Sequence, residues 1–137
     1  SVSTDMAGAR TKIKIGYGFQ LFEWRFVSGA TGAGDPVELP YYSDKSISVH
    51  HDNASGSTQY DIEGSNYTLT EYTGGTAKWD VLTDTTETDL TEAILGTDDG
   101  TAIAQILQHT MLIRPIVNVN SDNVITFRLL VGSTARG

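Results

Sequence analysis

Three histidines are the residues of this sequence best suited to acid–base chemistry or metal binding near neutral pH, and they stand at positions 50, 51 and 109. His50 and His51 are adjacent in a segment that we expect to be a strand, where successive side chains point to opposite faces of the sheet. They therefore cannot bind one metal ion together without a bulge. His109 precedes an apolar run, a position more typical of a structural histidine. The chain has no cysteine, which excludes a thiolate zinc site and a cysteine nucleophile.

Two other segments resemble known binding loops but lack the residues that the chemistry requires. Asp98-Asp99-Gly100 begins like a calcium loop, yet alternating ligands and a glutamate at the twelfth position are missing, so we expect a hairpin turn. The glycine-rich segment 29–36 ends in Pro36 and a strand instead of Lys-Ser/Thr and a helix, so it is not a phosphate cradle. The many acidic residues could include a glycosidase pair, but such a pair is defined by a spatial separation. We expect no catalytic residue, no metal ligand, no cofactor and no enzymatic activity.

Aromatic residues offer a different chemistry, because their rings can stack against sugars. Tyrosines cluster between residues 41 and 72, and Trp79 follows. In a carbohydrate-binding reading, the stacking residues would be Tyr67, Tyr72 and Trp79. The other reading is that these rings face the core or a neighbouring subunit.

The charge distribution limits the partners of the chain. The 137 residues carry a net charge of −8, and the excess of acid argues against nucleic acid, whose binding needs clustered cations. Residues 1–25 and 114–137 are each +2, whereas residues 26–113 are −12. No apolar run reaches the roughly 18 residues of a membrane span, so we expect no membrane partner. A chain with basic ends and an acidic middle can place its ends against a negatively charged neighbour.

The elements that must position these residues are short strands. Strict alternation of apolar and polar residues, or β-branched and aromatic content at period two, marks six segments. These are residues 12–15, 20–27, 46–49, 58–62, 78–82 and 125–131. Turn-forming residues separate them about every ten positions. The sequence therefore predicts an all-β, antiparallel, jelly-roll-like β-sandwich as a single domain over residues 11–137, preceded by an extended N-terminal arm, residues 1–10.

Two local features of this fold are less regular. Residues 89–95, closed by Gly96, have the cap and terminal glycine of a short helix, so the chain is expected to hold at most one short helix or a turn there. Pro115 interrupts the apolar run 111–117, and because it cannot donate to a strand ladder we expect it at an edge or a bulge.

From Ser28 onward the order of segments resembles small β-sandwich virion proteins of tailed bacteriophages, of the head decoration or capsid cement type. The segments that carry the resemblance are residues 28–39, 44–49, 60–66, 78–84 and 112–117, with Gly64-Ser65-Asn66 as a turn, Lys78-Trp79-Asp80-Val81-Leu82 as a Trp-centred strand and Ile113-Arg114-Pro115 in a late strand. The chain departs from the pattern at residues 67–76, which we expect to form an extra strand and turn or a protruding loop.

The resemblance implies a non-enzymatic virion structural protein, made in the host cytoplasm, that binds the capsid exterior and stabilises the shell. Its partners would be the major capsid protein and further copies of itself, as a homo-oligomer such as a trimer. We expect the N-terminal arm to face the shell and the acidic middle to face outward; the residues assigned to this capsid contact are Arg10, Lys12 and Lys14. Arg114 could contact the shell or pair with a nearby acid. The alternative is a carbohydrate-binding jelly roll, or a tail or fibre component with a receptor-binding role.

Overall fold

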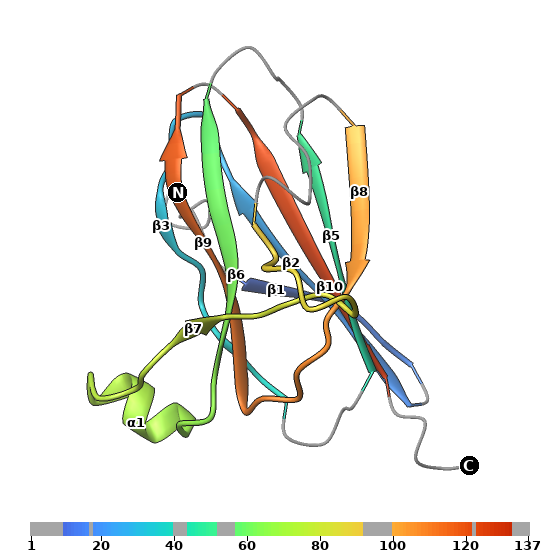
Figure 1. Cartoon of the computed structure of the whole chain (residues 1–137), viewed down its shortest axis with the longest axis vertical. Helices are drawn as coiled ribbons and strands as arrows, with labels where there is room; N and C mark the ends of the chain where they lie inside the picture. The colour runs from blue at the N-terminus through green and yellow to red at the C-terminus, as the bar shows by residue number, and fades with distance from the viewer. Residues whose placement is uncertain are drawn as a thin grey trace.

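The computed structural model describes residues 10–16, 18–39, 44–51, 57–91, 100–121 and 123–132, and in these parts it is an all-β sandwich with one short helix (Figure 1). The elements in chain order are β1 (Arg10–Gly16), β2 (Phe19–Phe26), β3 (Gly32–Ala33), β4 (Val37–Glu38), β5 (Asp44–His51), β6 (Thr58–Ser65), α1 (Leu69–Thr73), β7 (Asp80–Val81), β8 (Gly100–Gln105), β9 (Leu112–Asn120) and β10 (Ile125–Gly132).

The strands form two antiparallel sheets that face each other. Sheet 1 has the order β1-β2-β10-β5-β8, and sheet 2 has the order β3-β9-β6-β7, with β4 also paired to β9. In sheet 1, β10 lies between β2 and β5, although it comes from the other end of the chain. The sheet therefore depends on pairing between strands that are distant in the sequence. This arrangement confirms the predicted antiparallel sandwich.

The core lies between the sheets and is built by the alternation visible in the sequence. Phe127, Leu129 and Val131 on β10 are fully buried, as are Trp24 and Phe26 on β2. Each such side chain contributes about 1.5–3 kcal/mol through its burial. The expected alternation therefore predicts the inward face of both strands correctly.

The alternation fails in β1, the strand at the edge of sheet 1. Ile13 was expected on a covered face, but 41% of its surface is exposed. The pairing of β1 with β2 shifts between Lys12 and Lys14, which places Ile13 at a bulge. A bulge inserts one residue into the strand and breaks the alternation of faces.

Pro115 lies in a central strand and not at the predicted edge or bulge, since β9 pairs with β6 on one side and with β3 and β4 on the other. Its partner in β6 is Ile62, whose backbone N–H and C=O bond to Leu90 and Leu82 and so point away from β9. The backbone of Pro115 therefore points the other way, where its carbonyl accepts from the Gly34 amide at 2.8 Å. This is the interruption between β3 and β4, where the strand ladder has a gap and the missing proline N–H costs little.

The helix is found where a strand or loop was expected. Residues 69–73 form α1, which stands away from the sandwich at the lower left of Figure 1. A capping box begins it: the Glu71 amide donates to the Thr68 hydroxyl, and the Thr68 amide donates to the Glu71 carboxylate. An extra strand is thus wrong for this segment, because local capping decides its conformation. In the described part of the chain, no helix has the length and apolar character needed to cross a bilayer.

Several other predictions concern residues that lie partly or wholly outside the described ranges. The helix or turn predicted at 89–95 falls mostly in residues 92–99, which lie outside the description; Leu90 and Thr91, which are described, are extended and bridge to the second sheet. The N-terminal arm was expected to include Arg10, but β1 begins there, and residues 1–9 lie outside the described part. The strand expected at 78–82 is reduced to β7.

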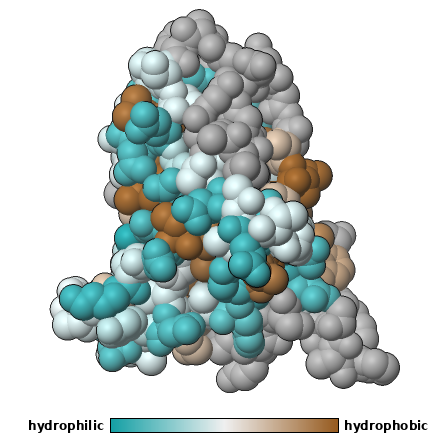
Figure 2. All heavy atoms as spheres, in the orientation of Figure 1, coloured by the Kyte–Doolittle hydropathy of each residue, from teal (hydrophilic) through white to brown (hydrophobic). Residues whose placement is uncertain are grey.

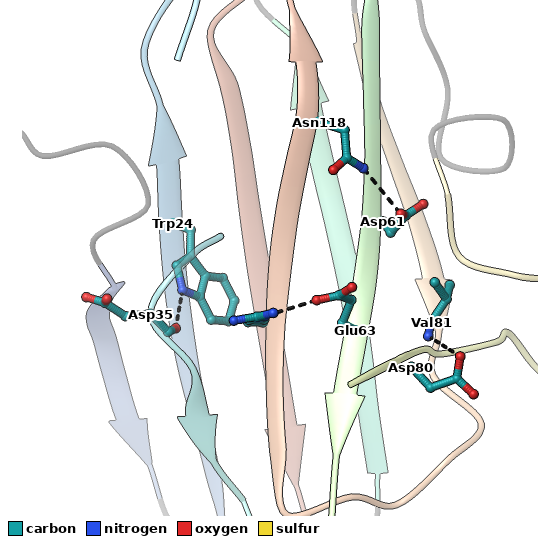
Figure 3. Close-up of polar contacts among 8 residues, drawn as sticks. Trp24, Asp35, Asp61, Glu63, Asp80, Val81 and Asn118 are labelled. Atoms are coloured by element: carbon teal, nitrogen blue, oxygen red, sulfur yellow. Dashed lines mark hydrogen bonds and ion pairs between the residues drawn. The ribbon is translucent and has the colours of Figure 1, made fainter. Parts of the chain in front are cut away.

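The glycine-rich segment 29–36 closes over the core tryptophan. Trp24 donates its indole N–H to the Asp35 carbonyl at 2.7 Å (Figure 3). A Cβ on Gly34 would lie 2.7 Å from the Trp24 ring, so a side chain there has no room. Gly34 thus lets the backbone pass tightly across the indole.

Candidate functional site

The histidines occupy opposite faces of sheet 1, as their adjacency predicted. His50 is exposed, whereas His51 is buried and its Nε2 lies 2.9 Å from the Tyr60 hydroxyl in the core. His109 is exposed at the surface. Within the described ranges, no three His, Asp or Glu side chains are grouped so that they could hold a metal ion.

The basic residues assigned to the capsid contact all lie in β1. Arg10 donates to the Pro36 carbonyl of its own chain at 2.7 Å, although its side chain remains exposed. Lys12 is also exposed, with its ammonium 5.7 Å from the centre of the Phe22 ring. The side chain of Lys14 lies outside the described atoms. The edge of sheet 1 therefore presents the charges of Arg10 and Lys12 from a strand that is paired with β2.

Of the three candidate sugar-stacking residues, two are brought together. Tyr72 on α1 and Trp79 pack edge to face, with ring centres 6.0 Å apart and planes at 88°. Tyr67 precedes the helix, and its described bond joins its backbone amide to the Ser65 hydroxyl at 3.1 Å. No described ring contact brings Tyr67 to the other two rings.

Arg114 holds this aromatic pair against sheet 2. Its guanidinium lies over the Trp79 ring, 3.8 Å from the centre, and its Nε is 3.0 Å from a Glu63 carboxylate oxygen. Figure 3 marks this ion pair by the dashed line at Glu63. The arginine side chain is 14% exposed and the glutamate 17%, so both charges are largely withdrawn from solvent. Of the two roles considered for Arg114, the structure shows the ion pair with an acid.

A pocket of about 300 Å³ opens beside Trp79, and we call it the Trp79 pocket. It forms where β6 ends, where β7 begins and where the chain approaches β9. Its lining residues are Gly64, Ser65, Asn66, Lys78, Trp79, Asp80, Val81, Leu82, Gln108 and Thr110. Its size is at the lower end of the range for small-molecule sites, and its walls mix apolar and polar groups.

Hydrogen bonds to the chain itself fix the orientation of the polar lining. Gln108 exchanges two bonds with Thr83, accepting from its amide at 2.9 Å and donating to its hydroxyl at 2.8 Å. Asn66 accepts from the Met111 amide at 3.2 Å, and Asp80 accepts from the Val81 amide at 2.9 Å (Figure 3). The pocket is thus shaped before any ligand arrives.

A second, larger hollow lies on the outer face of sheet 1. It has a volume of about 650 Å³ and is lined by residues of four strands, including Phe19, Leu130 and Ile103. We call it the outer groove. Lys45, at its inner end, is buried, and burial lowers the pKa of its ammonium group, an effect partly offset by the neighbouring Asp44 carboxylate.

Sequence reasoning missed the polar residues of the Trp79 pocket. Asn66, Asp80 and Gln108 come from segments up to forty-two positions apart and meet only because β6, β7 and the approach to β9 end together. Of these, Asn66 and Asp80 stood in the segments that carry the family resemblance, but as turn and strand residues. Nothing in the spacing of Gln108 signals its position.

Comparison with known proteins gives limited information. No family model matches the chain, and no curated protein matches it. Among solved structures, the chain is similar to YomS, a protein derived from the SPBc2 prophage, with a TM-score of 0.49 and 12% identity over 88% of this chain and 99% of that one. It is also similar to a cupin domain from Bordetella pertussis Tohama I, with a TM-score of 0.36 and 11% identity over 90% of this chain and 92% of the other. The sandwich assignment rests on the strand order and register of the chain itself.

Proposed function

We propose that this chain is a non-enzymatic structural protein of a tailed-phage virion: a head decoration protein that binds the capsid exterior as a homo-oligomer, such as a trimer, and stabilises the shell. The segments that resemble decoration proteins support this proposal, since residues 44–49, 60–66 and 112–117 contribute to β5, β6 and β9 of one sandwich. A protein of this kind performs no chemistry and acts through contact area repeated over many copies.

The observation that carries the proposal is a group of apolar side chains on the outer face of sheet 1, Phe19, Leu130 and Ile103, which line the outer groove beside polar residues and which we call the apolar face. Leu130 pairs with Leu21 on one side and with Ser46 on the other, so these three side chains point outward together. Ile103 on β8 pairs with Ser48, two residues after Ser46, and therefore points to the same face. Ile103 is 72% exposed and Leu130 is 43% exposed. Figure 2 shows exposed hydrophobic atoms at the right-hand edge, over β8. Apolar side chains gathered on one face are typical of a surface that another protein covers.

The opposite edge of the same sheet supplies the charge for attachment. Arg10 and Lys12 are exposed on β1, while the strands of sheet 2 carry the acids Asp61, Glu63 and Asp80. In this proposal the apolar face joins copies of the chain, and the basic edge with residues 1–9 approaches the capsid. Electrostatic attraction then orients each copy on the shell.

The test has two measurements with the full chain. Analytical ultracentrifugation gives the oligomeric state, and co-sedimentation with purified, undecorated heads gives capsid binding. We expect the wild type to be oligomeric and to sediment with the heads. A chain that is monomeric at every concentration and stays in the supernatant would overturn the proposal.

Variants separate the two surfaces. Ile103→Asp places a charge on the apolar face and should shift the protein to monomers, whereas Leu69→Asp makes the same change at an exposed leucine of α1 and should not. Lys12→Glu reverses an exposed charge on β1, so it should weaken head binding and leave the oligomer intact. Deletion of residues 1–9 removes no Lys or Arg and tests separately whether that segment contributes to head binding. Unchanged assembly of the Ile103 variant, or unchanged head binding of the Lys12 variant, would refute the corresponding surface.

A further inference from the structure

We propose that the Trp79 pocket is a binding site for a neutral saccharide, separate from the surfaces used for assembly. The pocket belongs to sheet 2 and its connections, whereas the apolar face and the basic edge belong to sheet 1. A protein attached to a particle through sheet 1 can therefore keep this pocket open to solvent. The inference does not depend on the capsid proposal, because it concerns different residues and a different ligand.

The first argument is the immobilised aromatic ring. Saccharide C–H groups pack against aromatic rings, and a ring that is already held in place loses little entropy on binding. Trp79 is held on one side by the Arg114 guanidinium at 3.8 Å and meets the Tyr72 ring at 6.0 Å. Glu63 in turn anchors the arginine. The indole reaches the pocket from a rigid support, although α1 itself is a short, protruding helix.

The second argument is the mixture of oriented donors and acceptors. Each sugar hydroxyl both donates and accepts, so it suits a pocket that offers amides, carboxylates and hydroxyls together. The Asp80 carboxylate uses one oxygen for the Val81 amide, and its second oxygen can accept from a hydroxyl. Asn66 uses its carbonyl oxygen for the chain, which turns its amide nitrogen into the donor for a ligand.

The third argument is charge, which decides the class of saccharide. Lys78 and Asp80 stand on either side of Trp79, so the pocket itself carries balanced charge. All ten lining residues and most of the acids of the chain belong to residues 26–113, whose net charge of −12 disfavours anions. A neutral hexose or N-acetylhexosamine unit fits both facts, whereas a sialylated or sulfated glycan does not.

The floor of the pocket depends on the absence of a side chain. A Cβ on Gly64 would lie 2.6 Å from a Leu82 methyl group and 2.9 Å from the Thr110 hydroxyl oxygen. These two walls close directly over the glycine backbone, and Thr110 is fixed by its bond to the Leu112 carbonyl at 2.9 Å. The depth of the pocket is therefore set by close packing and not by a mobile loop.

The experiment is an array of neutral glucose, galactose and N-acetylglucosamine oligosaccharides, with sialylated and sulfated glycans beside them, probed with the full chain. A bound oligosaccharide is then titrated in solution while acrylamide quenching of tryptophan fluorescence is followed. Trp24 is fully buried, so protection from quenching reports on Trp79. We expect binding of neutral glycans and reduced quenching.

Matched variants locate the site. Asp80→Asn keeps the oxygen that accepts from Val81 but loses the charged acceptor, and should weaken binding about tenfold. Trp79→Ala should abolish it. Asp35→Asn makes the same charge change on the far side of β9, as Figure 3 shows, and should bind like the wild type.

The outcomes are decisive in both directions. Binding of neutral glycans that is lost in the Trp79 variant, reduced in the Asp80 variant and retained in the Asp35 variant supports the proposal, provided that thermal melting shows all three folded. No binding on the array, binding of anionic glycans alone, or binding that ignores both pocket variants overturns it. Co-sedimentation with heads should be the same for the Asp80 variant and the wild type, so the two proposals can fail separately.

Discussion

Replacing Arg114 with methionine tests how the Trp79 pocket is held in place. Methionine keeps an unbranched stem of similar length but removes the guanidinium, which lies 3.8 Å from the Trp79 ring centre and whose Nε is 3.0 Å from the Glu63 carboxylate. The change therefore deletes a cation–π contact and an ion pair at once, and leaves the Glu63 charge largely withdrawn from water without its partner.

The magnitude follows from the exposure of the groups. An exposed pair contributes at most about 1 kcal/mol, but Arg114 and Glu63 are only 14% and 17% exposed, so their hydrogen-bonded pair should be worth about 1 kcal/mol or slightly more. The cation–π contact adds about 1 kcal/mol. We expect Arg114→Met to lower the free energy of unfolding by about 2 kcal/mol, which for a domain of this size lowers Tm by about 7 °C.

Urea unfolding followed by far-UV circular dichroism measures this loss, because that signal reports mainly on the secondary structure of the backbone. The control is Arg128→Met, whose arginine pairs with Glu23 at 2.8 Å with side-chain exposures of 46% and 23%; it should cost less than about 1 kcal/mol. A double-mutant cycle with Trp79→Leu should give a coupling near 1 kcal/mol. A coupling below about 0.3 kcal/mol, or equal losses for both arginines, would refute the assignment.

Two further predictions concern two turns: one is held by the buried Asn120, and the other is held by the carboxylate of Asp84. Asn120 is 8% exposed; its side-chain amide donates to three backbone carbonyls, and its carbonyl oxygen accepts from the Asn123 amide at 2.9 Å. Asn120→Ala should therefore lower the free energy of unfolding in urea by about 3 kcal/mol. A loss under about 1 kcal/mol would contradict the network. The hydroxyl of Thr86, with the amides of Thr88 and Thr86, lowers the pKa of the Asp84 carboxyl, so its contribution to stability is present above about pH 4 and is lost as the pH falls through the lowered pKa. Asp84→Asn should therefore be less stable than the wild type at pH 7 and lose that difference in acid, as urea midpoints at both pH values will show; a difference that does not depend on pH would exclude this role.

The strand pattern was readable from the sequence where a strand is covered on one face. β10 and β2 alternate cleanly, because each packs its inward side chains against the other sheet and turns the rest outward. The same rule failed at Ile13, since β1 is an edge strand with a bulge, and an edge has no second neighbour to enforce register.

The helix was a missed local signal. Thr68 and Glu71 have the spacing of a capping box, but the segment lies between predicted strands and in the stretch where the chain departs from the family pattern, which favoured an extra strand and turn or a protruding loop. The prediction of an edge or bulge for Pro115 was wrong for a different reason. The sequence shows that proline cannot donate a backbone hydrogen bond, but it does not show that the neighbours on one side of β9, β3 and β4, leave a gap opposite Pro115.

The candidate site shows the same division. Trp79 and Tyr72 were candidates from their residue types alone, and their ring contact joins α1 to the residue that precedes β7. Asn66, Asp80 and Gln108 were not identifiable, because amides and carboxylates at those spacings have no periodic pattern. Their convergence depends on which strands pair.

Residue type and periodicity alone determined the all-β class, the buried faces of the long strands and the absence of cysteine chemistry, because these depend on each residue and its close neighbours. Tertiary structure decided which strands became neighbours, and so it decided that Arg114 pairs with Glu63 fifty-one positions away and covers Trp79. It also decided that Ile103 and Leu130 share one uncovered face. The physical reason is that strand pairing and side-chain packing act between residues distant in the chain, and a single sequence carries no direct record of those distances.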